Sequence, residues 1–297
     1  MLDPRDLFTV DEDIRAGLAG HRPVLVHLTE GFIDGGQVGT VIDAHLMEQC
    51  DHEVLVEFDH DQLHDYRARR PTMVFHQNSW ESVSLPKLRI HRLIDDHGEP
   101  FLLLRGTEPA VQWERTAAAV TQLCHDLDVR LAATVAGAPM GVPHTRPLGV
   151  TAHASQPDLL ATEDLSDRWA NVEVPGSFNG FLQYTLGRND IPAAGHFVHV
   201  PHYLAQTAYL EAAEVGLTKL LGLTGLGIPL AGLTDAAVFN RSQIDEELSN
   251  SPEAQEVVAA LEEQYDEVTE PQVPSGDELA AEFQRFLAEQ PDTDPDT

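Results

Sequence analysis

A glycine-rich stretch in the first part of the chain has residue types that could bind an anion. Residues 31–36 read Gly-Phe-Ile-Asp-Gly-Gly and follow a short β-branched run. Glycines at a strand end let the backbone approach a ligand, and the helix that follows offers free N–H groups. The candidate ligand-binding residues are Gly31, Asp34, Gly35 and Gly36. The stretch is neither a G-x-G-x-x-G motif nor a P-loop, and Asp34 could simply cap the helix, so a structural turn is the alternative.

A second candidate segment, residues 137–147, leaves the end of another predicted strand. It carries His144, Thr145 and Arg146 between two prolines, and Gly137 opens it. Open α/β sheets place their sites at the carboxyl ends of strands, and prolines restrict the backbone that presents these side chains. Arg146 could hold an anion, and His144 could move protons. Alternatively, both side chains pair with carboxylates at a subunit contact.

Three more polar residues complete the set of candidate ligand-binding residues. Asn179 lies in a Pro-Gly-Ser-Phe-Asn-Gly turn, and His202 and Tyr203 follow a predicted strand. His60 and His64 have the spacing of two zinc ligands on a helix. They lie among aspartates in a solvated turn without the H-E-x-x-H pattern, so we predict no metal site.

The sequence contains no recognisable catalytic nucleophile. It has no G-x-S-x-G elbow, and Cys50 and Cys124 lie beside apolar neighbours, as buried cysteines do. We therefore predict no catalytic residue and no cofactor, and we favour a protein that is not an enzyme.

The elements that would position these residues are those of an α/β core spanning residues 1–233. Short β-branched runs alternate with helical periodicity, which favours a sheet flanked by helices. The predicted strands are residues 23–28, 53–58, 131–136, 149–152 and 196–200. The predicted helices are residues 37–49, 111–127, 181–186 and one from Pro201 to about residue 223.

Residues 72–105 interrupt this alternation with four strand-like runs and no helix between them. Either these strands extend the main sheet, or they form a protruding β-hairpin, inserted at about residues 72–100, that makes oligomer contacts. The pattern alone leaves both readings open.

The C-terminal part has helical periodicity at residues 235–248, 251–268 and 275–287. These helices could form a lid or a docking surface for a basic partner. Because their apolar positions need covering, we favour a helical lid over residues 234–290, and we expect residues 291–297 to be disordered. The glycine loop and residues 144–146 would then meet in one recess under this lid.

The net charge of the chain limits the classes of partner that it is expected to bind. The chain has 49 acidic and 18 basic residues, a net charge of −31. Binding phosphates of nucleic acid or an anionic membrane needs clustered lysine and arginine, so we predict neither partner. The sequence has no apolar run of the ~18 residues that cross a bilayer, and its N-terminus lacks a signal peptide pattern, so we expect a cytoplasmic protein.

Several motifs spread over nearly the whole chain carry a resemblance to a known family. They lie at residues 31–36, 66–71 (Tyr-Arg-Ala-Arg-Arg-Pro), 106–109 with Trp113, 142–147, 200–203, 274–279 and 282–287. The chain resembles the bacterial branch of the proteasome-assembly-chaperone family in these motifs and in their order. The bacterial members of that family are largely uncharacterised. One departure is Gly35, where the family usually has another small residue, which suggests a looser loop.

The resemblance implies a core similar to purine nucleoside phosphorylases and peptidyl-tRNA hydrolases. It also implies a β-hairpin insertion used in oligomerisation, a homotrimer, and a helical C-terminal lid over a pocket. It does not imply an activity, because kinship of fold does not transfer function.

Two functional hypotheses follow. The preferred one is a non-enzymatic, oligomeric binding or assembly protein, chaperone-like, that recognises a protein partner or a small-molecule ligand. The alternative is a phosphorylase- or hydrolase-type enzyme that acts on a small anionic substrate in the lid-covered pocket, with Arg146 on the anion and His144 or His202 moving protons.

Overall fold

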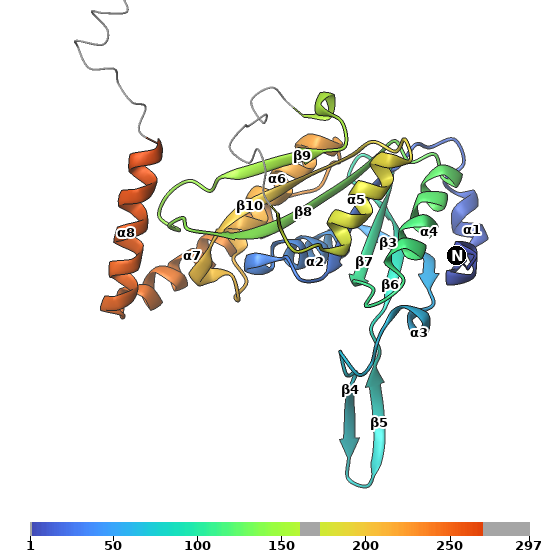
Figure 1. Cartoon of the computed structure of the whole chain (residues 1–297), viewed down its shortest axis with the longest axis horizontal. Coiled ribbons are helices and arrows are strands. Elements are labelled where there is room, and N and C mark those ends of the chain that lie inside the picture. The colour runs from blue at the N-terminus through green and yellow to red at the C-terminus, as the bar shows by residue number, and fades with distance from the viewer. Residues whose placement is uncertain (1, 161–172, 270–297) are drawn as a thin grey trace, which may run out of the picture.

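The computed structural model describes residues 2–160 and 173–269. Its centre is an eight-stranded sheet in the order β1-β3-β6-β7-β2-β8-β10-β9 (Figure 1). The strands are β1 (Phe8–Val10), β2 (Val24–Glu30), β3 (Asp51–Phe58), β6 (Leu88–Ile94), β7 (Pro100–Thr107), β8 (Leu131–Met140), β9 (Val150–Ala154) and β10 (Ala193–Pro201).

The four central strands, β7, β2, β8 and β10, run parallel, and antiparallel strands flank them on both sides. The first six residues of β2 are all buried. Their sequence, Val-Leu-Val-His-Leu-Thr, is mostly apolar, as is typical of a strand covered on both faces. The prediction of a mixed α/β fold, with a large sheet flanked by helices, is confirmed.

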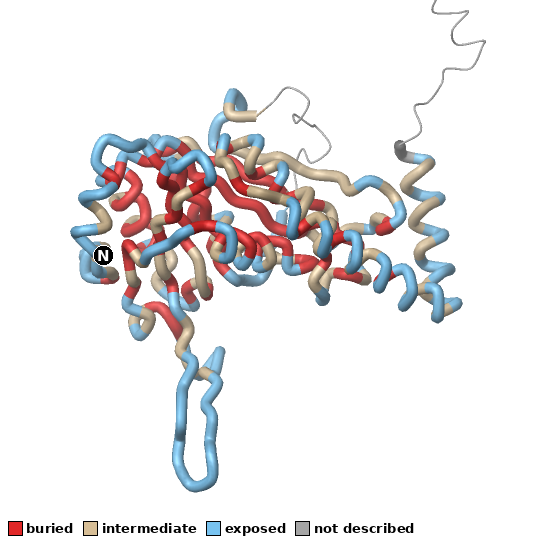
Figure 2. The backbone as a smooth tube through the Cα atoms, turned by 180° about the vertical axis from the view of Figure 1, so that it is seen from behind, coloured by how far each residue is buried: buried red, intermediate tan, exposed pale blue. Residues whose placement is uncertain are grey.

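Helices cover both faces of the sheet and bury two clusters of apolar side chains (Figures 1 and 2). The first face carries α1 (Glu12–Ala16), α4 (Trp113–Asp126) and α5 (Phe178–Arg188). The second carries α2 (Val38–Gln49) and α6 (Leu210–Thr224). A short helix, α3 (His60–Leu63), follows β3.

A two-stranded antiparallel sheet made of β4 (Thr72–His76) and β5 (Ser79–Ser84) stands apart from the main sheet. Every residue in both strands is exposed, and the hairpin projects from the core in Figures 1 and 2. Residues 88–94 and 100–107, by contrast, pair within the main sheet as β6 and β7. The second half of this region thus extends the main sheet, and the projecting strands span residues 72–84 rather than reaching residue 100. The oligomer contacts stay a prediction.

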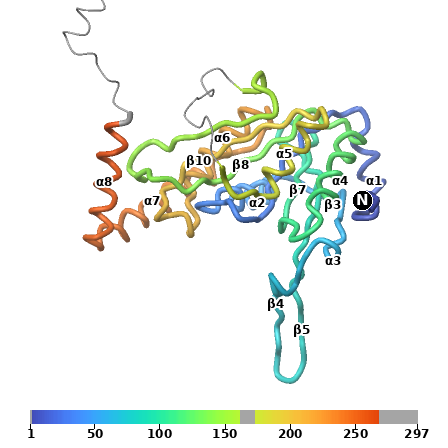
Figure 3. The backbone as a smooth tube through the Cα atoms, viewed as in Figure 1, coloured from blue at the N-terminus to red at the C-terminus, as the bar shows by residue number. Residues whose placement is uncertain are grey.

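Two C-terminal helices, α7 (Ala231–Ser249) and α8 (Pro252–Thr269), follow α6. The former packs against α6 and buries Leu233, Ala237 and Ile244. The latter lies at the far end of the molecule, beyond α7 (Figure 3). The helix predicted at residues 275–287 and the disorder predicted at residues 291–297 lie outside the described residues.

The helix predicted to begin at Pro201 differs in the structure. Pairing of β10 with β8 continues through Pro201, and a 3-10 turn follows at residues 202–204. The backbone then bonds to the glycine loop, because Gly36 N donates to Ala205 O and Tyr209 N donates to Gly36 O, both at 2.9 Å. These external bonds delay the helix until Leu210.

Within the described part of the chain, no helix combines the length and hydropathy needed to cross a membrane.

Candidate functional site

The glycine loop lies directly against the carboxyl-terminal part of β8. A Cβ atom on Gly137 would lie 1.8 Å from the carbonyl oxygen of Gly35, and one on Gly35 would lie 2.9 Å from ring carbons of Pro139. Gly36 adopts a φ of +67°, which favours glycine. These glycines are needed for backbone packing between the loop and β8.

Asp34 caps helix α2. Its Oδ1 accepts a 2.7 Å hydrogen bond from Gly39 N, and its Oδ2 accepts bonds from the amide and hydroxyl of Thr40 at 3.1 and 3.0 Å. The carboxylate thus takes up the N–H groups that an anion would need at this helix N-terminus. In this structure Asp34 is therefore a helix cap, which is the alternative role that the sequence offered for it.

His144 is buried, with 3% of its surface exposed, between Tyr203 and helix α7. The Tyr203 hydroxyl accepts from His144 N at 2.9 Å and lies 2.7 Å from Nδ1. Because the Asp245 carboxylate can only accept, Nε2 carries the proton of the neutral ring and Nδ1 accepts from the Tyr203 hydroxyl. Nε2 then donates to Asp245 Oδ1 at 3.1 Å. Burial, reinforced by the nearby positive charge of Arg241, lowers the pKa of His144, so the ring is neutral near pH 7.

This chain of polar contacts continues along α7. Arg241 donates to Asp245 Oδ1 at 3.1 Å and to Glu211 Oε2 at 2.9 Å. Glu211 also accepts a 2.9 Å bond from the fully buried Tyr209 hydroxyl, and burial raises the pKa of that phenol. The network ties α7 to α6 and to the segment that follows β8.

Thr145 and Arg146 face helix α8 in the same way. Arg146 donates to both carboxylate oxygens of Asp266 at 2.8 and 2.7 Å, and to Glu262 Oε1 at 3.2 Å. The hydroxyl of Thr145 donates to the same Glu262 oxygen, and Tyr265 OH donates to Pro147 O at 3.0 Å. The predicted pairing of Arg146 and His144 with carboxylates is therefore seen, but the carboxylates belong to this chain's own C-terminal helices.

Asn179 and Gly31 form a separate group on the α5 side of the sheet. Asn179 Oδ1 accepts from Thr29 N at 3.3 Å and from the Thr29 hydroxyl at 3.0 Å. A Cβ atom on Gly31 would lie 2.4 Å from Glu108 Oε2, which accepts a 3.0 Å bond from Phe178 N. His202 is exposed, and its ring meets the edge of the Tyr203 ring, with centroids 5.4 Å apart.

The predicted residues thus fall into two groups. One comprises Gly31 and Asn179, and the other is gathered where β8 and β10 end, against α7 and α8. Sequence does not single out the partners Asp245, Glu262 and Asp266, because residues 241–297 hold 17 acidic residues and spacing favours none of them. The described residues contain no group of three or more His, Cys, Asp or Glu side chains placed to hold a metal ion.

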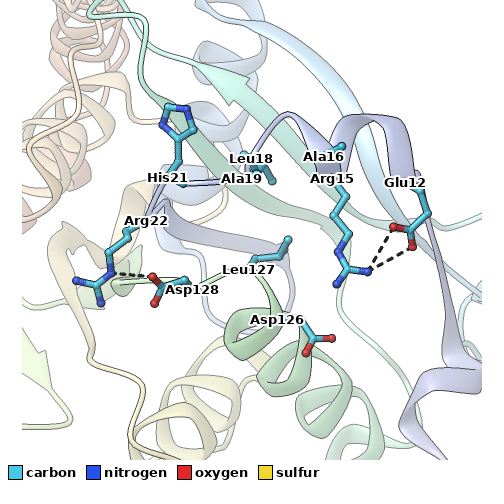
Figure 4. Close-up of a pocket in the computed structure, with 11 residues that line it drawn as sticks. Glu12, Arg15, Ala16, Leu18, Ala19, His21, Arg22, Asp126, Leu127 and Asp128 are labelled. Carbon is cyan, nitrogen blue, oxygen red and sulfur yellow. Dashed lines mark hydrogen bonds and ion pairs between the residues drawn. The ribbon is translucent and has the colours of Figure 1, made fainter.

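A cavity of about 520 Å³ lies elsewhere, between α1 and the end of α4 (Figure 4). Its arginines are paired, Arg15 with Glu12 at 3.4 Å and Arg22 with Asp128 at 3.0 Å. Arg22 lies two residues before the start of β2, so the cavity lies at the amino end of the parallel strands, where open α/β sheets seldom place a site. Its paired charges make it a weak candidate.

The fold and these contacts define a class: a mixed α/β protein with a projecting hairpin and a C-terminal helical arm fastened by charged contacts. The chain belongs to the PAC2 family, whose model matches residues 28–248, and the resemblance to proteasome-assembly chaperones is thereby confirmed. A search of curated proteins found no significant match.

Solved structures agree with this assignment. A Mycobacterium tuberculosis protein of unknown function, Rv2714, is 36% identical, with a TM-score of 0.80 over 95% of this chain and 92% of its own. A protein of unknown function from Corynebacterium glutamicum is 34% identical, with a TM-score of 0.81 over 89% of this chain and 98% of its own. The Mycobacterium tuberculosis proteasome-assembly chaperone homologue Rv2125 shares the fold at 24% identity, with a TM-score of 0.71 over 79% and 99% of the two chains.

Proposed function

We propose that this protein is a non-enzymatic, chaperone-like assembly protein that forms oligomers through its hairpin and binds a protein partner. Membership of the PAC2 family and the likeness to a proteasome-assembly chaperone homologue support an assembly role. The proposed oligomer is a homotrimer and the proposed place of action is the cytoplasm, as expected from the sequence and its family resemblance.

The observation that carries the proposal is the apolar face of the hairpin. Met73 pairs with Val83 and Phe75 with Trp80, and directly paired residues share a face of the sheet. Met73 and Phe75 are two residues apart in β4, so all four side chains lie on one face. A register shift beside Phe75 leaves one extra residue in β5, which brings Trp80 and Val83 to that same face.

This face is exposed in the single chain. The exposed fraction is 64% for Trp80 and 56% for Phe75, and their ring centroids lie 5.0 Å apart. An isolated two-stranded hairpin is marginally stable in water, and contiguous exposed apolar surface marks an interaction site. Contact with second copies of the chain would bury these rings and stabilise the hairpin.

The C-terminal helices are proposed to act as a cover over residues 144–147. No residue of α8 from Pro252 to Glu267 is buried, so its described contacts with the core are mainly polar. A helix held in this way can detach without exposing the apolar core, and detachment of α8 would free the side chains of Thr145 and Arg146 for a partner, whereas His144 would stay bonded to Tyr203 and α7.

The enzyme alternative has less support. Arg146 is taken up by Asp266 and Glu262, and the Asp34 carboxylate caps α2. In this arrangement neither side chain is available to a substrate.

The molar mass of the protein in solution tests the proposal. Light scattering coupled to gel filtration should give three times the 32.6 kDa of one chain for the native protein. The double variant Phe75→Ser/Trp80→Ser should elute as a monomer with an unchanged far-ultraviolet circular dichroism spectrum, because the hairpin does not contribute to the main core.

A matched control is Val238→Ser/Phe239→Ser, which removes two side chains of α7 that are 69% and 65% exposed. It should leave the mass unchanged. A native protein that is monomeric, or a hairpin variant that keeps the native mass, would contradict the proposed interface.

A further inference from the structure

A second cavity, of about 480 Å³, opens at the base of the hairpin, and none of the predicted site residues lines it. Its walls are the two chain segments that enter and leave the hairpin, together with the ends of β2 and β7. The lining residues are Glu30, Arg69, Arg70, Pro71, Thr72, Ser84, Leu85, Pro86, Lys87, Arg105, Gly106 and Thr107. A volume of this size is typical of small-molecule sites.

The charge of this cavity is opposite to that of the protein as a whole. Four of its lining residues are cationic in a chain with a net charge of −31. Arg105 is held by Asp43 through bonds of 2.7 and 2.6 Å, and Arg69 lies 3.8 Å from Glu30 with both side chains largely exposed. Among the described residues, Arg70 and Lys87 have no ion-pair partner, so two positive charges are left uncompensated.

The frame around these cations is stiff. Pro71 and Pro86 flank the hairpin, one on each of its two connections, and restrict the backbone there. A Cβ atom on Gly106 would lie 1.9 Å from Lys87 O, so the backbone leaving the hairpin packs directly against β7. Thr107 N donates to the same oxygen at 2.9 Å. Lys87 is thus anchored at its backbone while its side chain remains exposed.

The position in the sheet is also that of a ligand site. Glu30 and Thr107 are the last residues of the parallel neighbours β2 and β7, and they pair with each other. Ligands of open α/β sheets bind outside the carboxyl ends of parallel strands. Guanidinium groups and a lysine ammonium are the side chains that proteins use for phosphate.

From these observations we infer that the cavity at the base of the hairpin binds a small phosphate dianion, either inorganic phosphate or the phosphate group of a monoester. Two unpaired cations match the charge of a dianion. A cavity volume of about 480 Å³ suits a small molecule better than an extended acidic surface. A bound phosphate would join the hairpin to the end of the sheet and fix the angle at which the hairpin leaves the core.

Calorimetric titration of the full-length protein in about 150 mM NaCl, where surface charges are largely screened, tests the site. Inorganic phosphate and glycerol 3-phosphate are the two probes, and comparison of their affinities identifies which source of phosphate fits. We expect at least one to bind with a Kd of about 1 mM or tighter. Arg70→Gln/Lys87→Gln should weaken that binding by at least about tenfold, because charged hydrogen bonds are lost.

The matched control is Arg5→Gln/Arg22→Gln, which removes the same charge from two residues that do not line the cavity and should bind as tightly as the native chain. Three results would overturn the inference: no binding of either probe by the native protein, equal binding by the Arg70/Lys87 variant, or equal weakening by the control. A variant that changes the molar mass of the protein without any phosphate binding by the native chain would instead assign this surface to an acidic protein partner.

Discussion

The guanidinium group of Arg146 donates hydrogen bonds of 2.8 and 2.7 Å to the two carboxylate oxygens of Asp266. These residues lie 120 positions apart, one after β8 and the other in α8. Arg146 lowers the pKa of Asp266, so the pair stays ionised at neutral pH. Because α8 buries none of its residues from Pro252 to Glu267, this pair and the contacts of Glu262 and Tyr265 hold the helix in place.

Arg146→Gln should therefore release α8 while leaving the core intact. We expect faster amide hydrogen exchange in residues 252–269, with the midpoint of global unfolding almost unchanged. Mass-spectrometric hydrogen exchange measures both regions in one experiment. Asp266→Asn should reproduce the effect, and Glu263→Gln, on an exposed position of the same helix, should not. Unchanged exchange in α8 of the Arg146 variant would show that other contacts fix the helix.

Tyr203→Phe removes the hydroxyl that satisfies two groups of His144. The amide N–H and the Nδ1 atom of the buried His144 then lose their partner, and leaving buried polar groups unpaired costs roughly 1 to 3 kcal/mol. We expect the free energy of unfolding to fall by that amount in urea titrations. Asp245→Asn should cost less, since Asp245 is 52% exposed and water can replace it. Equal costs for the two variants would contradict the assigned network.

The sequence predicts much of this arrangement, and the remainder depends on contacts between distant segments. Short β-branched runs that alternate with helical periodicity predict the α/β sheet, because a strand buried on both faces consists largely of apolar residues. Periodicity also predicts α7 and α8. The roles of Gly35 and Asp34 could not be predicted, because a ligand loop and a packed, capped turn use the same residue types. Only the structure separates the two, because it shows that a Cβ atom on Gly137 would lie 1.8 Å from Gly35 O, so the loop packs directly on β8.

The cationic cavity shows a different limit of sequence reasoning. Its residues come from four separate stretches, and only the Tyr-Arg-Ala-Arg-Arg-Pro segment is a visible basic cluster. The net charge of the whole chain disfavours large anionic partners, because it repels them at long range. Local charge within one cavity is set by the fold that brings Arg69 and Arg70 to Lys87 and Arg105.

Stability should fall in mild acid because of buried neutral histidines. Burial lowers the pKa of His27 to about 4, and burial with the nearby charge of Arg105 lowers that of His91 to about 4. A histidine whose pKa is depressed on folding stabilises the native state fully above about pH 6.5, and this contribution is lost as pH falls toward 4. Between about pH 7.5 and 5.5, the two residues together should cost roughly 2 to 3 kcal/mol in the free energy of unfolding, measured by urea titration.

His91→Leu isolates one part of this effect. Both ring nitrogens of His91 are buried and lack a hydrogen-bond partner among the described residues, whereas His27 Nδ1 contacts Asn179 at 3.2 Å. The variant should be as stable as the native protein or more stable at about pH 7.5, since an unpaired polar group is removed. It should also remove roughly 1 to 1.5 kcal/mol of the decline between about pH 7.5 and 5.5, the remainder coming from His27 and from His153, whose pKa burial also lowers to about 4. An unchanged decline would assign the pH dependence to other groups.

Gly137→Ala and Gly222→Ala form a contrasting pair that tests whether the glycine loop is a packing device. A Cβ at Gly137 would meet Gly35 O at 1.8 Å, whereas one at Gly222, in α6, would meet nothing within 4 Å. The first substitution forces the backbone of the loop away from β8 and should destabilise the protein by roughly 2 kcal/mol or more. The second should stabilise it by up to about 1 kcal/mol, because alanine favours a helix interior over glycine. Urea unfolding measures both, and a Gly137→Ala protein of native stability would mean that the loop can move away from β8 at little cost, as a ligand-binding loop would.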